Sequence, residues 1–371
     1  MKVAFASCCH APNSISSSQP IWGIIQKQEP DLLVLLGDNV YIGKEGYDAK
    51  DLKWKMKILE AEYKSQLAEP HFSKLLDEVP FLVVWDNHDL GLPGEKYRDE
   101  HPNADVYGAE VSTEFRDASR ELFNEYFRLK PKSIIRPSNK IYGSHVFGEG
   151  DKKIKFIMLD VRSWQEDPAS GDDAKLIGEK QKEWLKDEML SGEAGINVVC
   201  SGMTFTVDNN PDKKGGWEQH VNWFREFKDI AKETSRPLFL GGNIHRNNFH
   251  PYQLDGIGRN AKYLYEIISS GIGHRFKPNG DDPSPDDDED VDEATGIDEI
   301  RLRRIRSSGA GFNTFSKLPC HNYGIIDFTD TLVKVTLYSQ KPGNNYYAEI
   351  SRDSWRLKKN WRMGDYSYNY D

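Results

Sequence analysis

Short apolar runs alternate with longer amphipathic stretches along most of the chain. The stretch over residues 51–67 has apolar side chains at helical spacing, and Pro20 after Ser18 is typical of a helix start for residues 20–27. Three runs near the start are almost continuously apolar, as in strands buried on both faces of a parallel sheet. These runs are residues 3–7, 31–36 and 81–85. The start of the chain therefore predicts strand–helix–strand units and an α/β fold.

The same alternation continues towards the end of the sequence. It predicts three more helices, over residues 109–126, 178–189 and 217–233. It also predicts further strands, over residues 141–147, 154–159, 196–200, 237–240, 264–269, 323–328 and 332–339. The sequence contains no internal repeat.

The composition is that of a folded chain without a membrane-spanning helix. Of the 371 residues, 37% are apolar and 12% aromatic, which is enough for a large core in one or two domains. No window approaches the ~18 consecutive apolar residues of a transmembrane helix. Four cysteines are too few for a disulfide scaffold, so we expect free thiols. Residues 1–6 are too short and strand-like for a signal peptide, so we expect a cytoplasmic protein, although a removed leader fits the same sequence.

The negative charge of the chain is local. The formal net charge is −10, but residues 281–293 hold nine acidic side chains, and removing these nine charges leaves −1. A chain without a global basic field gives no strong signal for nucleic-acid binding. We predict that the acidic insert, about residues 278–298, is a mobile surface loop. A calcium-binding loop is the alternative, but the spacing lacks the glycine and the terminal glutamate of an EF-hand.

Polar and metal-binding residue types follow five of the predicted strands, where open α/β sheets place their sites. A buried aspartate there is costly unless it is paired or metal-bound, and amide, imidazole and carboxylate groups suit divalent cations. An arginine offers a forked donor for phosphate oxygens. A capping turn, an ion pair or a packed histidine explains one such cluster more easily than five. The clusters are Ser7-Cys8-Cys9-His10, Gly37-Asp38-Asn39-Val40-Tyr41, Asp86-Asn87-His88-Asp89, Asp160-Val161-Arg162 and Gly241-Gly242-Asn243-Ile244-His245.

Nine short motifs, in the same order, resemble the alkaline phosphatase D (PhoD-like) branch of the calcineurin-like metallophosphoesterases. Each motif alone is weak, but the ordered set spans most of the chain. The motifs are FASCC, GDNVY, VVWDNHDLG, LDVRSW, LIGEKQKEWL, VVCSGMTF, FLGGNIH, LYEIISSGIGH and NYGIIDF. The motifs begin at residue 5, so we expect no counterpart of that family's N-terminal Ig-like domain and a match to its shorter members.

The resemblance implies one domain over residues 1–371, built as an α/β/β/α sandwich of two sheets with helices outside and metals at the strand ends. It implies that Cys8, Asp38 and Tyr41 bind one metal and that Asp38 bridges to a second. In the best-understood members these metals are ferric iron and calcium, and Mn or Zn are the alternatives. Cys8 is preferred to Cys9 as the ligand, because Cys9 falls where the family usually has a polar residue. Adjacent strand residues point to opposite faces, so we do not expect both thiols to bind one metal.

The same resemblance assigns the remaining site residues. Asn87 and His88 take a ligand place and a phosphate-contacting place, Arg162 contacts the phosphate, and Asn243 and His245 complete the site. Either histidine could ligate a metal or protonate a leaving group. The family has aspartate at both asparagine positions. Asn87 agrees with the pattern of the wider superfamily, whereas Asn243 removes a negative charge without such a precedent.

These residues predict metal-assisted hydrolysis of small phosphate esters at a dinuclear site, by a phosphomonoesterase, a phosphodiesterase or both. The alternative is a catalytically weak relative that binds a phosphorylated ligand or a partner protein. A nuclease or a phospholipid-cleaving enzyme ranks third, because there is no strong basic groove and no amphipathic membrane helix. The sequence favours no oligomeric state. We expect the aromatic C-terminal tail, about residues 355–371, to pack on the surface rather than cover the pocket.

Overall fold

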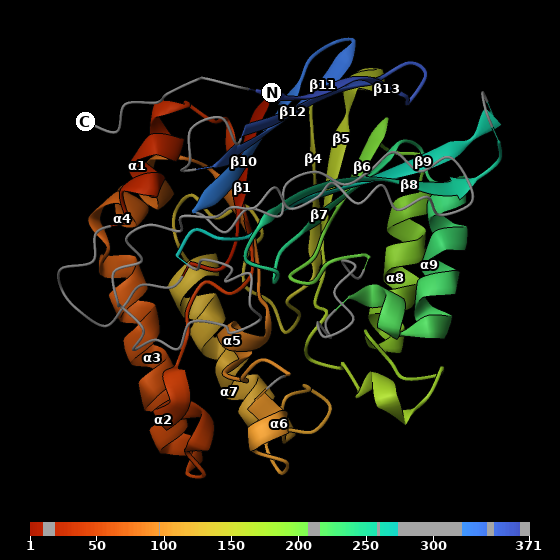
Figure 1. Cartoon of the computed structure of the whole chain (residues 1–371). Helices are drawn as coiled ribbons and strands as arrows, with labels where there is room; N and C mark the ends of the chain where they lie inside the picture. The colour runs from red at the N-terminus through yellow and green to blue at the C-terminus, as the bar shows by residue number, and fades with distance from the viewer. Residues whose placement is uncertain are drawn as a thin grey trace, which may run out of the picture.

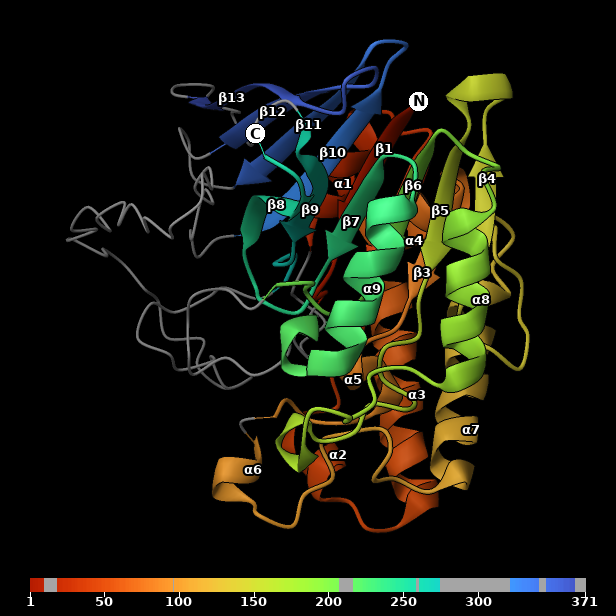
Figure 2. The same cartoon turned by 90° about the vertical axis from the view of Figure 1, so that its right-hand side faces the viewer.

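Two sheets pack face to face in the computed structural model, and helices cover the outer face of each sheet (Figure 1, Figure 2). The fold is the predicted α/β/β/α sandwich. The structure describes residues 1–9, 19–95, 97–206, 216–257, 260–273, 321–339 and 345–363.

The first sheet has the strand order β13-β12-β11-β10-β1-β2-β3. Its parallel part consists of the first three apolar runs, β1 (Lys2–Ala6), β2 (Leu32–Leu36) and β3 (Phe81–Val84). Its antiparallel part consists of β10 (Asn322–Phe328), β11 (Leu332–Ser339), β12 (Asn345–Ser351) and β13 (Leu357–Met363). Because β10 pairs with β1, a strand from late in the sequence lies beside the first one.

The second sheet has the strand order β4-β5-β6-β7-β9-β8. Four parallel strands form its centre, β5 (Ile154–Met158), β6 (Ile196–Cys200), β7 (Pro237–Gly241) and β9 (Lys262–Ser269). An antiparallel strand flanks each side, β4 (Gly143–Phe147) and β8 (Asn247–Asp255). Both sheets therefore contribute the ends of parallel strands to one end of the sandwich.

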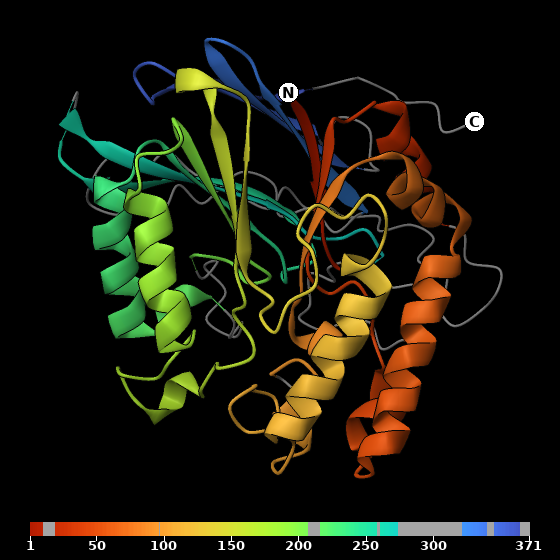
Figure 3. The same cartoon turned by 180° about the vertical axis from the view of Figure 1, so that it is seen from behind.

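Helices pack on the outer face of each sheet (Figure 3). The first sheet is covered by α1 (Pro20–Lys27), α3 (Leu52–Ala68), α4 (Pro70–Glu78) and α7 (Thr113–Phe123), which continues as a π-helix over Asn124–Arg128. The second sheet is covered by α8 (Glu179–Leu190) and α9 (Val221–Glu233). Short helices lie in the connections, α2 (Gly43–Asp48), α5 (Asn87–Leu90), α6 (Tyr97–Glu100) and the 3₁₀ turns Gly150–Lys152, Pro168–Ser170 and Trp217–Gln219.

Alternate side chains of a buried strand enter different cores. Val3 and Phe5 of β1 lie in the core between the sheets. Ala4 and Ala6 of the same strand lie in the core beneath the helices of the first sheet. A strand that is buried on both faces needs apolar residues at every position, which explains the continuous apolar runs. Cores on both faces hold the strand ends, and the polar clusters that follow them, in place.

Every predicted strand is confirmed to within two residues, and the helix over residues 20–27 is confirmed without change. The helix predicted over residues 109–126 begins later, at Thr113, because Ser112 caps it by accepting a hydrogen bond from the Phe115 amide at 3.1 Å. Strands β8, β12 and β13 were not predicted. The expectation of a C-terminal tail is therefore wrong for Leu357–Met363, which form a strand at the edge of the first sheet.

Two expectations remain, one about the acidic insert and the end of the chain and one about membrane-spanning helices. The acidic insert and residues 364–371 lie outside the described residues. Among the helices that the structure describes, none has the length and apolar character needed to cross a membrane.

Candidate active site

The ends of β1, β2 and β7 approach each other closely where the polar clusters begin. Gly242, just after β7, permits this approach. A Cβ atom at that position would lie 2.7 Å from the carbonyl oxygen of Leu36 and 2.8 Å from Ser7 Oγ. Only glycine fits such a gap without moving backbone atoms. The close contact brings side chains from three separate parts of the sequence into one pocket.

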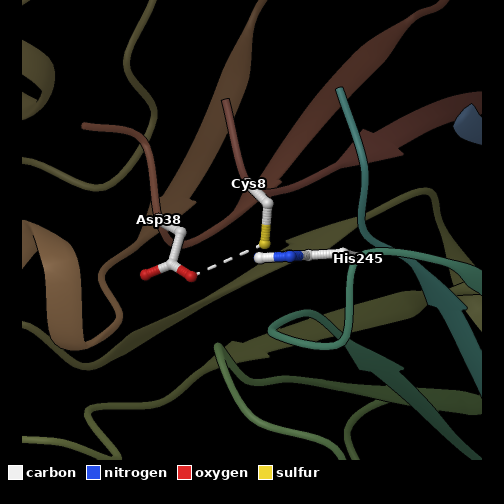
Figure 4. A group of neighbouring side chains, drawn as sticks. All are labelled: Cys8, Asp38 and His245. Carbon is white, nitrogen blue, oxygen red and sulfur yellow. Dashed lines mark hydrogen bonds between the residues drawn. The ribbon is translucent and has the colours of Figure 1, made fainter. Parts of the chain in front are cut away.

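Cys8, Asp38 and His245 form a buried cluster in this pocket (Figure 4). Each offers one ligand atom, and these atoms all lie within 4.8 Å of one another. Cys8 Sγ lies 3.5 Å from Asp38 Oδ2 and 3.0 Å from Ser270 Oγ. The exposed fractions of the three residues are 0%, 1% and 5%. Cys9 packs instead in the core beneath the helices of the first sheet.

The backbone at this cluster is strained. Cys8, Asp38, Asn243 and His245 have φ angles of 59°, 50°, 72° and 54°, in the left-handed region that side chains with a Cβ disfavour. Each such residue costs about 1–3 kcal/mol and persists where its surroundings hold it. The Cys8 amide donates to the Gly37 carbonyl at 3.2 Å, which is one of these restraints. Strain of this kind is concentrated at functional sites.

The charge balance of the cluster favours a bound cation. Burial raises the pKa of the Asp38 carboxyl, while Arg162 and His245 oppose that rise. The Cys8 thiol lies beside this carboxyl with no exposed surface. Two buried acidic groups are stable as anions only if a positive charge compensates them. Thiolate, carboxylate and imidazole together suit iron or zinc, so this donor set fits a metal of that kind.

Tyr41 and His88 lie against Asp38. The Tyr41 hydroxyl donates to Asp38 Oδ2 at 3.2 Å, and the His88 amide donates to Asp38 Oδ1 at 3.3 Å. The rings of Tyr41 and His88 are in contact and tilted against each other, with their centroids 4.2 Å apart. Burial, followed by the nearby Asp38 charge, raises the pKa of the Tyr41 hydroxyl well above its ordinary value. A metal bound by a Tyr41 phenolate would therefore have to displace a tightly held proton.

Arg162 is buried at the edge of the pocket and is paired with Asp86. Its Nε donates to Asp86 Oδ1, and its Nη2 donates to Asp86 Oδ2 at 3.0 Å. Its Nη1 donates to Gln165 Oε1 at 2.8 Å. Burial raises the pKa of Asp86 to about 6, although Arg162 opposes that rise and Asp38 adds to it. Among the residues that the structure describes, these bonds use three of the five guanidinium N–H groups, which leaves two for an anion.

The two asparagines differ in their surroundings. Asn87 is 3% exposed, and its Nδ2 donates to the carbonyl of Leu92 at 3.3 Å. Asn243 is only half-buried. Within the described ranges, no hydrogen bond joins the Asn243 side chain to the buried cluster. The structure therefore brings together Cys8, Asp38, Tyr41, His88, Arg162 and His245, with Asn87 beside His88 on α5 and Asn243 two residues from His245.

Four residues at the site were not predicted to have a role. Asp86 pairs with Arg162, Ser270 contacts Cys8, and Tyr47 contacts His88. Asp89 accepts hydrogen bonds from the Asn39 amide at 3.0 Å and the Asp86 amide at 2.9 Å, so it ties the end of β2 to the start of α5. Asp86, Asp89 and Ser270 stand inside quoted motifs, which was a usable signal. Tyr47 stands in no motif.

Comparison with models of known protein families shows which family this chain belongs to. Residues 3–310 match the family model described as PhoD-like phosphatase, which is most of the sequence. The chain belongs to the PhoD-like phosphatase family. The resemblance of the nine motifs is thereby confirmed.

Individual relatives of this PhoD-like chain are distant. It is 24% identical to alkaline phosphatase D of Bacillus subtilis (strain 168) over 282 residues, which are 66% of this chain and 46% of that protein. The chain thus spans less than half the length of this curated relative. A solved structure of PhoD has a TM-score of 0.68 at 14% identity, covering 100% of this chain and 72% of that one. Purple acid phosphatase PPD1 from yellow lupin has a TM-score of 0.47 at 10% identity, covering 98% and 54%.

Proposed function

We propose that this PhoD-like chain is a metal-dependent hydrolase of small phosphate esters. The observation that carries the proposal is the buried Cys8–Asp38–His245 cluster at converging strand ends. Its acidic groups lie in a pocket whose neighbouring arginine has two N–H groups left for an anion. A cation site beside a phosphate donor is the arrangement that metal-assisted ester hydrolysis needs.

The proposed centre is dinuclear. Cys8, Asp38, Tyr41 and His245 would hold one cation, and Asp38 with Asn87 and Asn243 would hold the other. The sulfur and nitrogen donors favour iron or zinc in the first position, and the oxygen donors favour calcium or manganese in the second. Asp38 supports a bridging role, because its two oxygens already face different partners, Tyr41 with Oδ2 and His88 with Oδ1.

The chain's own residues would bind and orient the ester. The metals would supply charge neutralisation and an activated water. Arg162 would donate its remaining N–H groups to phosphate oxygens, held in plane by Asp86 and Gln165. The ring of His88, which packs against Tyr41, would donate a hydrogen bond to the substrate. A preorganised set of donors acts without reorganising when charge develops on the ester oxygens.

The test is turnover of p-nitrophenyl phosphate and bis(p-nitrophenyl) phosphate by protein loaded with Fe, Ca, Mn or Zn, singly and in pairs. Asp38→Asn is the diagnostic variant, because asparagine tolerates the φ of 50° and keeps the shape of the side chain. Asp229→Asn is the matched control, since its carboxylate is exposed and pairs with Lys232 on the surface. Metal analysis of each sample accompanies the assay.

Metal-dependent turnover that Asp38→Asn abolishes and Asp229→Asn retains would support the proposal. The faster ester would then name the substrate class. Stoichiometric metal without turnover of either ester would refute the hydrolase and favour the phosphate-binding alternative. Turnover that survives in Asp38→Asn would refute the assignment of the centre.

A further inference from the structure

Tyr47 holds one ring nitrogen of His88. Its hydroxyl oxygen lies 2.7 Å from His88 Nδ1, a short hydrogen bond. Tyr47 belongs to α2, and His88 belongs to α5, which follows a different strand. No motif contains Tyr47. The bond therefore links a site residue to a connecting helix that the proposed function does not otherwise use.

His88 is restrained from three sides. Its backbone amide donates to Asp38 Oδ1 at 3.3 Å, which fixes the backbone from which its side chain extends. Its ring lies tilted against the ring of Tyr41, with a centroid distance of 4.2 Å and an interplanar angle of 36°. The Tyr47 hydroxyl then sets the rotation of the ring about its own axis. An imidazole with these three restraints is held in one orientation.

Tyr47 is itself supported. Its ring meets the ring of Tyr97 edge-on, with centroids 5.5 Å apart. The Tyr97 hydroxyl donates to Asp48 Oδ1 at 2.5 Å, and Asp48 is the residue after Tyr47. The contact between α2 and α6 therefore keeps the Tyr47 hydroxyl in place. A residue held this way is suited to orient another side chain rather than to react.

We propose that Tyr47 is a positioning residue, whose O–H donates to Nδ1 of His88 so that the Nε2–H of His88 donates to the leaving oxygen of the phosphate ester. The inference rests on the proposed function. A hydroxyl that donates to Nδ1 places the proton of the neutral ring on Nε2. Tyr47 thus sets both the tautomer and the aim of the ring, and no proton moves between Tyr47 and His88.

The first measurement is kinetic and compares Tyr47→Phe with the wild type on two esters. Phenyl phosphate has a poor leaving group that develops much negative charge, and 2,4-dinitrophenyl phosphate has a good one that develops little. A misplaced donor to the leaving oxygen should lower kcat for phenyl phosphate about 10- to 100-fold. It should lower kcat for the dinitrophenyl ester less than about threefold. Tyr126→Phe is the matched control, because it removes a hydroxyl that contacts Glu60 at 3.3 Å, away from the pocket.

The second measurement does not depend on activity. Long-range ¹H–¹⁵N correlation spectra of Zn²⁺-loaded, [¹⁵N]histidine-labelled protein report the tautomer of His88, which His88→Gln identifies by difference. We expect the Nε2–H form in the wild type and in Tyr126→Phe. We expect a shifted Nδ1 resonance and a mixture of forms in Tyr47→Phe.

The outcomes separate this inference from the proposed function. A selective loss on phenyl phosphate together with the expected spectra supports the role of Tyr47. An equal loss on both esters, no loss, or an Nδ1–H form in the wild type overturns it. If the wild type hydrolyses neither ester, the proposed function fails and the leaving-oxygen role falls with it, while the spectra still decide whether Tyr47 sets the ring.

Discussion

Glu266 is a buried acid whose ionisation should destabilise the folded protein. It lies in β9 with no exposed surface. Its Oε1 accepts hydrogen bonds from the amides of Phe205 at 2.7 Å and Thr206 at 3.2 Å, and its Oε2 accepts one from the Thr206 hydroxyl. Burial raises the pKa of Glu266 from 4.5 to about 7, although these hydrogen bonds oppose the rise. Glu266→Gln keeps the shape and the Oε1 acceptor but cannot ionise.

The sign of the effect follows from the direction of the shift. A carboxyl whose folded-state pKa is raised contributes stability fully below its unfolded pKa, here 4.5, and loses it as the pH rises through about 7. The difference between these two values is worth about 3 kcal/mol, at ~1.4 kcal/mol per pH unit. Glu266→Gln should therefore raise the free energy of unfolding by about 3 kcal/mol at pH 8. The gain should be only about 1 kcal/mol at pH 5.

Urea unfolding at pH 5, 6, 7 and 8, followed by circular dichroism at a fixed metal concentration, measures this difference. Comparing variant with wild type at each pH cancels the titration of the groups that both proteins share. Glu121→Gln, an exposed change on α7, should run parallel to the wild type at every pH. If the curve for Glu266→Gln also runs parallel to the wild type, the burial argument is refuted.

Three further predictions concern the pocket. Cys8→Ser should weaken Zn²⁺ binding by more than about tenfold in competition with a chelator but leave Ca²⁺ binding nearly unchanged, and equal losses for both ions would contradict the assigned sulfur ligand. Arg162→Met should lower the free energy of unfolding by about 3–5 kcal/mol because Asp86 remains as an unpaired buried charge. The double variant with Asp86→Asn should recover part of that loss, and strict additivity in urea unfolding would argue against the pair. Gly202→Ala should lower the free energy of unfolding by about 1–3 kcal/mol and reduce turnover, because its Cβ would lie 2.7 Å from the Asp86 carboxyl. An unchanged Tm would show that the backbone around Gly202 shifts without cost and would contradict this prediction.

The central strands were predictable because burial on both faces leaves a strong pattern. β2 and β6 are apolar at almost every position and were found within one residue of their bounds. β8 reads NNFHPYQLD, in which a proline and five polar residues hide an antiparallel strand near the sheet edge. β12 and β13 are similarly mixed, and β13 falls within the stretch that was expected to be an aromatic tail. Edge strands are defined by the partner they pair with, which local sequence does not reveal.

The residues of the site likewise divide into those that the local sequence predicted and those that it did not. Asp38 and His88 stand directly after apolar runs, so the position of each strand end predicted them. Asp86 stands in the same stretch, but its role depends on Arg162, which lies 76 residues further along the chain. Tyr47 lies in a short helix that carries no motif, and its hydroxyl contacts His88, which is 41 residues further along the chain. Partnerships of this kind depend on packing between connections, and residue spacing does not encode them.

The pairing of β10 with β1 has a consequence for how the protein folds while it is being synthesised. The Met1 amino group donates to the Phe328 carbonyl, across 327 residues. The Cys8 carbonyl likewise accepts from the Gly273 amide, at 2.9 Å. A ribosome adding about 5–20 residues per second needs roughly 15 to 60 seconds between making β1 and making β10. During that time the first strand has no partner on one side and the thiol of Cys8 has no finished pocket. A metal bound at Cys8, as proposed above, would therefore load only after nearly the whole chain has left the ribosome, and the nascent Cys8 thiol would be exposed to oxidants and competing ions until then.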